Sequence, residues 1–158
     1  MYLLWLHMIT SNTHFAIATH VLAVLALHES TLMTSGQLAF SVDTNPAFLR
    51  AVLGRLREAE LITTRLGKGG GSTLARPAGS ITLLDVFRAT EGTARLAQHD
   101  CGGSACPVGK KMPELLQGLE CRLDALLADE LSNTTVADLA IELRPVMQAA
   151  PQAPAPPA

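Results

Sequence analysis

The sequence predicts a mainly α-helical protein with a small β-hairpin: a winged helix-turn-helix followed by a long C-terminal dimerisation helix. Two observations predict this class. Hydrophobic residues make up 48% of the 158 residues but aromatic residues only 4%, so the core is built from Leu, Ala, Val and Ile, a composition that favours helices. Residues 61–75 alone break the helical pattern, with β-favouring runs on both sides of a glycine-dense turn.

Charge is unevenly distributed along the chain. Residues 34–76 carry six basic and three acidic groups, whereas residues 77–158 carry six basic and ten acidic groups. This asymmetry predicts one module that faces nucleic acid and a second module with another task. The apolar start, "MYLLWLHMI", lacks the features of a signal peptide, and no clean apolar run is long enough to span a bilayer. We therefore expect a cytoplasmic protein without a membrane partner.

The first two helices are predicted from composition and capping. Residues 13–28 are apolar on nearly every face, which is typical of a central, buried helix. Residues 34–42 form a short second helix, for which Thr34 or Ser35 is a suitable N-cap.

The third helix, residues 46–59, begins after Asn45 as a cap, with Pro46 in its first turn. Apolar residues recur on it at spacings of three and four and form a core stripe: Phe48, Leu49, Val52, Leu53 and Leu56. In a helix-turn-helix this second helix enters the major groove and presents its N-terminal residues to the bases. Asn45 and Arg50 are side chains suited to reading adenine and guanine.

The C-terminal half is predicted to hold three more helices. They cover residues 80–92, 112–131 and 134–143. The middle one has coiled-coil character because leucines repeat at spacings of four and three, and its predicted dimer interface is Met112, Leu116, Leu119, Leu123 and Leu126.

The predicted organisation has five parts. They are an N-terminal extension (1–12), the winged helix-turn-helix (13–92), a cysteine-containing sensor linker (93–111), the dimerisation helix with the C-terminal helix (112–143) and a disordered Pro/Ala tail (144–158).

Five segments, in this order and spacing, resemble the Rrf-two family of bacterial winged-helix regulators, which includes the IscR, NsrR and BadM types. They are "FAIATHVLAVLALH", "TNPAFLRAVLGRLREAELI", "GKGGGSTLARP", "ITLLDVFRATEG" and "CPVG", and the resemblance spans roughly residues 13 to 143. It implies a homodimer that binds an imperfect palindrome in double-stranded DNA. Together with the helix-turn-helix analysis it gives these candidate DNA contacts: Ser35, Thr44, Asn45, Pro46, Arg50, Arg65, Lys68, Gly69, Gly70 and Gly71.

Two positions depart from the family pattern. Many members place an arginine that enters the minor groove just before the first wing glycine, where this chain has Leu66; Arg65 or Lys68 is the available substitute. The family usually has Ala-Gly-Leu before the first wing strand, whereas this chain has Glu60 as the middle residue, which adds a negative charge near the wing.

The stretch "HDCGGSACPVGKK" (99–111) admits three interpretations. The first is an iron–sulfur cluster held by Cys101 and Cys106, with Cys121, His99 and His20 as weaker candidate ligands. Cys121 lies fifteen residues after Cys106 in the predicted long helix, which argues against one cluster that joins all three cysteines. Whether a metal is bound stays open at this point.

The second interpretation is a thiol switch. Two glycines between Cys101 and Cys106 permit the close approach that a disulfide needs, and the following lysines and helix start favour a reactive Cys106. The third is that the cysteines sense nothing: Cys106 is a small residue before a helix that begins at Pro107, and Cys121 packs in the dimer core.

The sequence therefore predicts a homodimeric DNA-binding transcriptional regulator, a repressor, with thiol oxidation as a candidate input; the choice between redox and metal input stays open. An iron–sulfur sensor of the same family is the alternative, and from another class, a winged-helix adaptor that binds proteins instead of DNA. No cofactor is certain. An enzyme is not expected, because no catalytic constellation accompanies the histidines.

Overall fold

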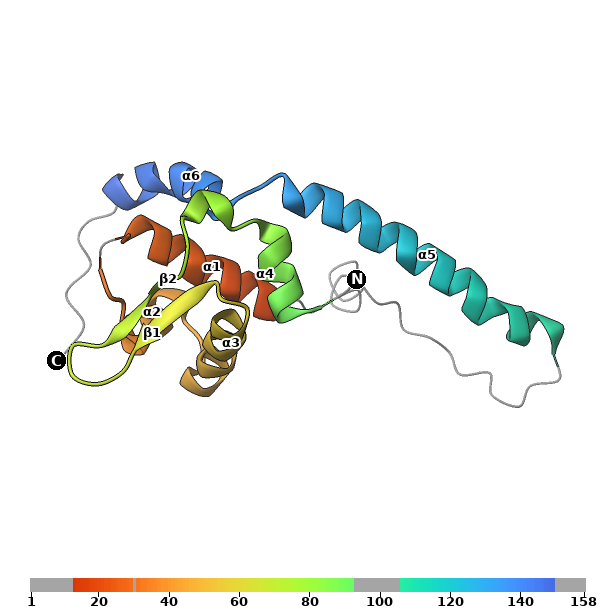
Figure 1. The fold of residues 1–158 in the computed structure, drawn as a ribbon, viewed down its shortest axis with the longest axis horizontal. Helices are drawn as coiled ribbons and strands as arrows, with labels where there is room; N and C mark the ends of the chain where they lie inside the picture. The colour runs from red at the N-terminus through yellow and green to blue at the C-terminus, as the bar shows by residue number, and fades with distance from the viewer. Residues whose placement is uncertain (1–12, 30, 93–105, 150–158) are drawn as a thin grey trace, which may run out of the picture.

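The computed structural model describes residues 13–29, 31–92 and 106–149 (Figure 1). The elements follow in the order α1 (Thr13–Leu27), α2 (Ser35–Val42), α3 (Pro46–Glu58), β1 (Ile62–Arg65), β2 (Gly71–Leu74), the short 3₁₀ helix η2 (Ala78–Ser80), α4 (Leu83–Thr90), α5 (Pro107–Ser132) and α6 (Val136–Ala149). Two strands pair as an antiparallel hairpin directly after the helix pair α2–α3. The predicted fold class, mainly helical with a β-hairpin wing, is confirmed.

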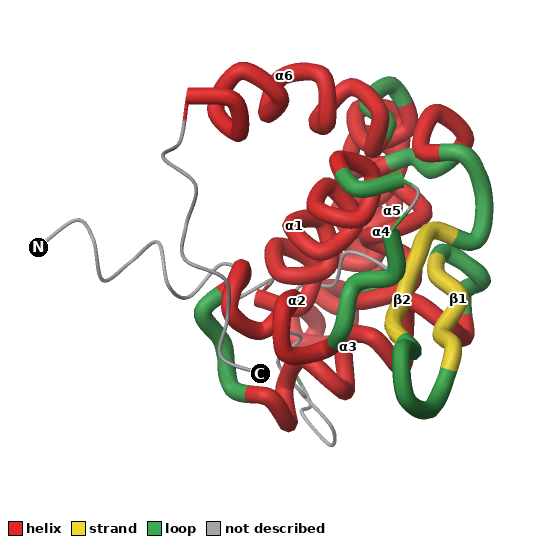
Figure 2. Tube along the Cα trace, turned by 90° about the vertical axis from the view of Figure 1, so that its left-hand side faces the viewer, coloured by secondary structure: helices red, strands yellow, loops and turns green. Residues whose placement is uncertain are grey.

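Helix α1 is the centre of the core. It packs against α2, α3, α4, α6 and β2, and Figure 2 shows it surrounded by these elements. This position explains why its sequence is apolar on nearly every face. The fully buried side chains that meet around it include Val21, Leu22, Leu25, Leu38, Leu49, Val52, Leu56, Ile81, Val86 and Val136.

Short helices begin where capping chemistry predicts. Thr34 caps α2 in a capping box: its hydroxyl accepts from the Gln37 N–H, and the Gln37 side chain accepts from the Thr34 N–H. Thr82 and Asp85 repeat this arrangement at α4. Because Thr82 is the cap, α4 runs from Leu83 to Thr90 and is shorter than the predicted 80–92.

Two predicted boundaries in the C-terminal half are wrong. Helix α5 begins at Pro107, not at 112, because a proline fits the first helical position without losing a hydrogen bond. Residues 107–111 therefore belong to the helix and not to the linker. Helix α6 continues through Pro145 to Ala149, so residues 144–149 are helical and not part of a tail. The interior proline removes one backbone hydrogen bond without ending the helix.

Helix α6 packs into the common core against α1, although the sequence analysis grouped it with α5. Val136 and Ala140 are buried in the common core. A short bridge between Thr82 and Thr135 joins the starts of α4 and α6, with the Leu83 N–H donating to the Thr134 carbonyl at 2.9 Å. Helix α5, which lies between α4 and α6 in the sequence, extends away from the rest of the molecule (Figure 1). Within the described ranges, no helix is long and apolar enough to cross a membrane.

Candidate nucleic-acid interface

The start of α3 is built by its cap. Asp43, in a left-handed conformation (φ 44°), ends α2 and turns the chain. Asn45 then caps α3, its Oδ1 accepting from the Ala47 N–H at 2.8 Å, and Pro46 occupies the first turn. The cap thus uses one of the two acceptor positions on the Asn45 oxygen that a bidentate contact with adenine also needs. The exposed Asn45 amide can still donate to a phosphate.

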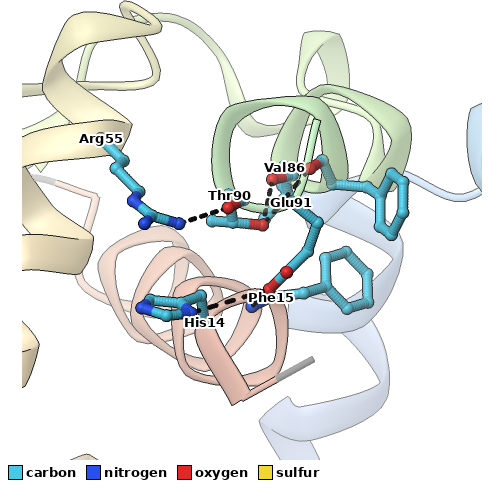
Figure 3. Close-up of polar contacts among 7 residues, drawn as sticks. His14, Phe15, Arg55, Val86, Thr90 and Glu91 are labelled. Carbon is cyan, nitrogen blue, oxygen red and sulfur yellow. Dashed lines mark hydrogen bonds and ion pairs between the residues drawn. The ribbon is translucent and has the colours of Figure 1, made fainter. Parts of the chain in front are cut away.

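Arg50 and Arg55 lie on the same helix but have different environments. Arg50 is exposed one turn into α3, and no ion pair joins it to another described residue. Arg55 donates from its guanidinium to the Thr90 carbonyl at the end of α4 (Figure 3). Arg50 is therefore available for a base contact from the first half of α3, whereas Arg55 holds α3 against α4 and Arg57 is exposed in the last turn of the helix.

A polar and aromatic cluster fixes α3 on the core. His14 stacks on Phe48 with ring centroids 4.6 Å apart, which joins α1 to α3. The Glu91 carboxylate accepts from the Phe15 N–H at 3.2 Å, and its Oε1 lies 3.9 Å from His14 Nδ1 (Figure 3). Sequence analysis missed this cluster, because its members are far apart in the chain and no local pattern links them.

The hairpin pairs Arg65 with Gly71, which leaves residues 66–70 as its loop. The Gly70 N–H donates to the Gly67 carbonyl at 2.9 Å, and Gly69 has a φ of 76° at the third turn position. A type II turn requires this positive φ, so glycine is favoured there. Arg65 and Lys68 are both exposed beside the turn.

The last two glycines of the run serve internal packing. A Cβ on Gly70 would lie 2.2 Å from the Arg65 carbonyl oxygen, and one on Gly71 would lie 2.8 Å from the Met33 carbonyl oxygen. Gly71 is buried, and Ser72 forms a bridge with Met33 that ties the wing to the start of α2. Gly71 is thus wrongly placed among the candidate DNA contacts: its small size serves the protein's own backbone.

The start of α3 and the tip of the hairpin face the same side of the molecule. Both lie at the lower edge in Figure 1 and again in the perpendicular view of Figure 2. Of the other candidates, Ser35 is exposed in the first turn of α2 and Thr44 is half-buried. The structure therefore brings the helix-turn-helix candidates and the wing tip to one surface.

Helix α5 carries an exposed leucine stripe. Met112, Leu119, Leu123 and Leu126 are exposed, with Leu126 reaching 68%, and Leu116 is half-buried. Adjacent members lie three or four residues apart and share one face of the helix. A row of leucines left in water is costly, so this face is suited to a partner helix.

The two described cysteines lie far apart on α5. Cys106 is its exposed N-cap, and the backbone N–H groups of Gly109 and Val108 lower the pKa of its thiol. Cys121 is also exposed, and it follows Met112 by nine residues, which at about 100° per residue places it on the side opposite the leucine stripe. Cys121 therefore does not lie on the face that carries the predicted dimer interface, which argues against its packing in the dimer core.

The described donors do not fit an iron–sulfur cluster. Cys106 and Cys121 are separated by about 22 Å along the helix axis. His20 Nε2 lies 3.2 Å from Ser41 Oγ, so this side chain faces α2. Among residues 13–29, 31–92 and 106–149, no three His, Cys, Asp or Glu side chains lie close enough to share a metal ion. Cys101 and His99 fall outside the described residues.

Comparisons with known proteins agree with this geometry. Residues 11–142 match the family model Rrf2, described as an iron-dependent transcriptional regulator. The chain is 33% identical over 129 residues to YwnA of Bacillus subtilis, a protein named as an HTH-type transcriptional regulator, covering 81% of this chain and 95% of YwnA. It is 28% identical over 137 residues to the HTH-type transcriptional regulator IscR of Cereibacter sphaeroides, covering 86% and 88%.

A solved structure shares the fold. CymR, the global cysteine regulator of B. subtilis, superimposes with a TM-score of 0.63 at 20% identity, over 85% of this chain and 98% of CymR. The family match covers the helix-turn-helix, the wing, α4, all of α5 and the first half of α6. The chain belongs to the Rrf2 family of DNA-binding transcriptional regulators.

Proposed function

We propose that this protein acts in the cytoplasm as a homodimeric repressor that binds an imperfect palindrome in double-stranded DNA and responds to thiol oxidation. The observation that supports DNA reading is the common surface formed by the start of α3, with Arg50 exposed and unpaired by any described carboxylate, and the basic wing tip. A helix start can read bases in the major groove, while a wing beside it contacts the backbone or the minor groove.

The leucine stripe on α5 supports the dimer. Its apolar face points away from the core of its own chain, and a second copy of the same helix is complementary to it. Two α3 helices held by such a dimer would meet two half-sites of a palindrome. Repression follows if the bound dimer occludes a promoter.

Cys106 supports the thiol input. Its lowered pKa raises the fraction of thiolate, which is the reactive form. In the proposed step the thiols of Cys106 and Cys101 lose two protons and two electrons to hydrogen peroxide, which becomes two water molecules while a disulfide forms. The cluster alternative draws on the IscR relative and the family description, but the described donors do not fit it and we derive no step through it.

A gel shift with promoter fragments from the genome that encodes this protein tests the DNA-binding proposal. We expect a subset of promoter fragments to be retarded specifically, with an affinity that falls as salt rises, because bound phosphates release counterions. Treatment with peroxide should weaken that retardation in the wild type and leave a Cys106→Ser variant unchanged. Retardation of no specific fragment would favour the winged-helix adaptor instead.

A further inference from the structure

The tip of the wing carries an apolar side chain in open solvent. Leu66 is 87% exposed, more than any other large hydrophobic residue among those described. It follows Arg65, the last residue of β1, and precedes Gly67, whose φ of 95° turns the chain away from the strand. Lys68 is exposed two residues later. No element of the described chain covers Leu66.

The hairpin holds this tip firmly. Four residue pairs align β1 with β2, and the hydroxyls of Thr64 and Ser72 lie 3.2 Å apart across it. The Ser72 N–H donates to the Met33 carbonyl at 2.8 Å, and the Met33 N–H donates back at 3.0 Å. A leucine displayed on such a fixed support keeps its position relative to α3, which is what a recognition residue requires.

From this placement we propose that Leu66 is a specificity-determining residue of DNA binding that enters the minor groove as an apolar contact; this rests on the proposed function. The minor groove is about 6 Å wide and 7.5 Å deep, and apolar side chains of minor-groove binders pack into it against base steps. Besides Leu66, the tip bears only the side chain of Lys68, since residues 67 and 69–71 are glycines. A turn so poor in side chains can approach the groove closely.

Leu66 and Lys68 have different roles at the tip of the wing. Lys68 supplies charge to a phosphate, so its contribution falls with salt. Leu66 supplies contact area without charge, so its contribution is independent of salt. Such a contact also favours deformable or A·T-rich base steps, because the binding free energy includes the cost of deforming the groove around the leucine side chain.

The probe is the 30-base-pair duplex that the wild-type protein enriches from a random library. Its affinity is measured for the wild type and for the variants Leu66→Ala and Lys68→Ala at several salt concentrations. We expect Leu66→Ala to bind about five- to tenfold more weakly with an unchanged salt slope. Lys68→Ala should reduce the slope by about one unit.

A third variant, Leu66→Arg, tests the chemistry at the tip. It should increase the salt slope by about one unit, because it adds a phosphate-neutralising charge. Both substitutions lie at an exposed position, so thermal unfolding should change little. Wild-type affinity in Leu66→Ala, or an altered salt slope in that variant, would overturn the assignment. If the wild type enriches no duplex, the proposed function fails and the wing assignment falls with it.

Discussion

Glu60 occupies a backbone conformation that glycine adopts more readily. Its φ is 56°, and it follows the end of α3 as the first residue beyond the cap. Its N–H donates to the Arg57 carbonyl at 3.0 Å, and the N–H of buried Leu61 donates to the carbonyl of buried Leu56 at 2.9 Å. These two bonds form the Schellman pattern, in which this position is usually glycine. We predict that Glu60→Gly stabilises the protein.

The magnitude follows from three contributions. A non-glycine residue in the left-handed region costs about 1–2 kcal/mol. A carboxylate beside a helix C-terminus is unfavourable by about 0.3 kcal/mol at an exposed position. Glycine loses more conformational freedom on folding than glutamate, which destabilises the Glu60→Gly variant by about 0.5–1 kcal/mol. The free energy of unfolding should therefore rise by roughly 1 kcal/mol, which corresponds to a Tm increase of about 2–4 °C.

The assay is thermal unfolding at one fixed protein concentration, because a dimer's Tm depends on concentration. Ala59→Gly is the matched control: Ala59 has a φ of −83°, so glycine there should lower stability by about 0.5–1 kcal/mol. Glu60→Ala removes the carboxylate but keeps the unfavourable φ, and should change stability by only a few tenths of a kcal/mol. Equal shifts for the two glycine variants, or no gain for Glu60→Gly, would refute the reasoning.

Four further predictions concern the interface, the dimer, the wing and the thiol. Arg50→Ala should cost about 1–3 kcal/mol of specific DNA binding in a gel shift; unchanged affinity rejects a base-reading role. Leu123→Glu should yield monomers in sedimentation analysis, because it places charges in the helix pair; an intact dimer would locate the interface elsewhere. Gly70→Ala should lower stability by about 1–3 kcal/mol, since its Cβ meets a backbone oxygen at 2.2 Å, whereas Gly54→Ala, with open space in mid-helix, should gain up to about 1 kcal/mol. Alkylation of Cys106 should show a pH midpoint below that of an ordinary thiol, because its lowered pKa keeps more thiolate as pH falls; an ordinary midpoint contradicts the helix-start effect.

Local signals in the sequence predicted most element starts. The caps at Thr34 and Asn45 satisfy N–H groups of their own helices, so residues within one turn carry the information. Helix α4 was begun too early, at residue 80, because its cap is Thr82. The wing was predictable for the same reason, since its turn chemistry lies within a few residues. The start of α5 and the end of α6 were misplaced. Residues 107–111 were assigned to the linker, although one interpretation of the cysteines already began a helix at Pro107. Residues 144–149 were assigned to the Pro/Ala tail, but Pro145 lies inside α6.

Contacts between segments that are distant in the chain could not be predicted from the sequence. The bond from Arg55 to the Thr90 carbonyl spans 35 residues, and nothing near Arg55 distinguishes it from Arg50. The glycine run shows the same limit: its composition predicted a turn, but only the fold shows that Gly71 is small because Met33 approaches it. Tertiary packing thus decided which members of each candidate group are free to contact DNA.

The position of Cys106 restricts how oxidation could reach the DNA-reading surface. Helix α5 has 26 residues and is about 39 Å long. Cys106 starts it at the end remote from α3 (Figure 1), while the other end leads into the Thr82–Thr135 bridge between α4 and α6. A change at Cys106 therefore cannot act on α3 of its own chain through direct contact. An effect on α3 would have to travel along α5 of the same chain or, in the proposed dimer, through the partner chain. Leu123→Glu separates these routes: loss of the oxidant effect on residual DNA binding favours the route through the partner, and an effect that persists favours the route along α5.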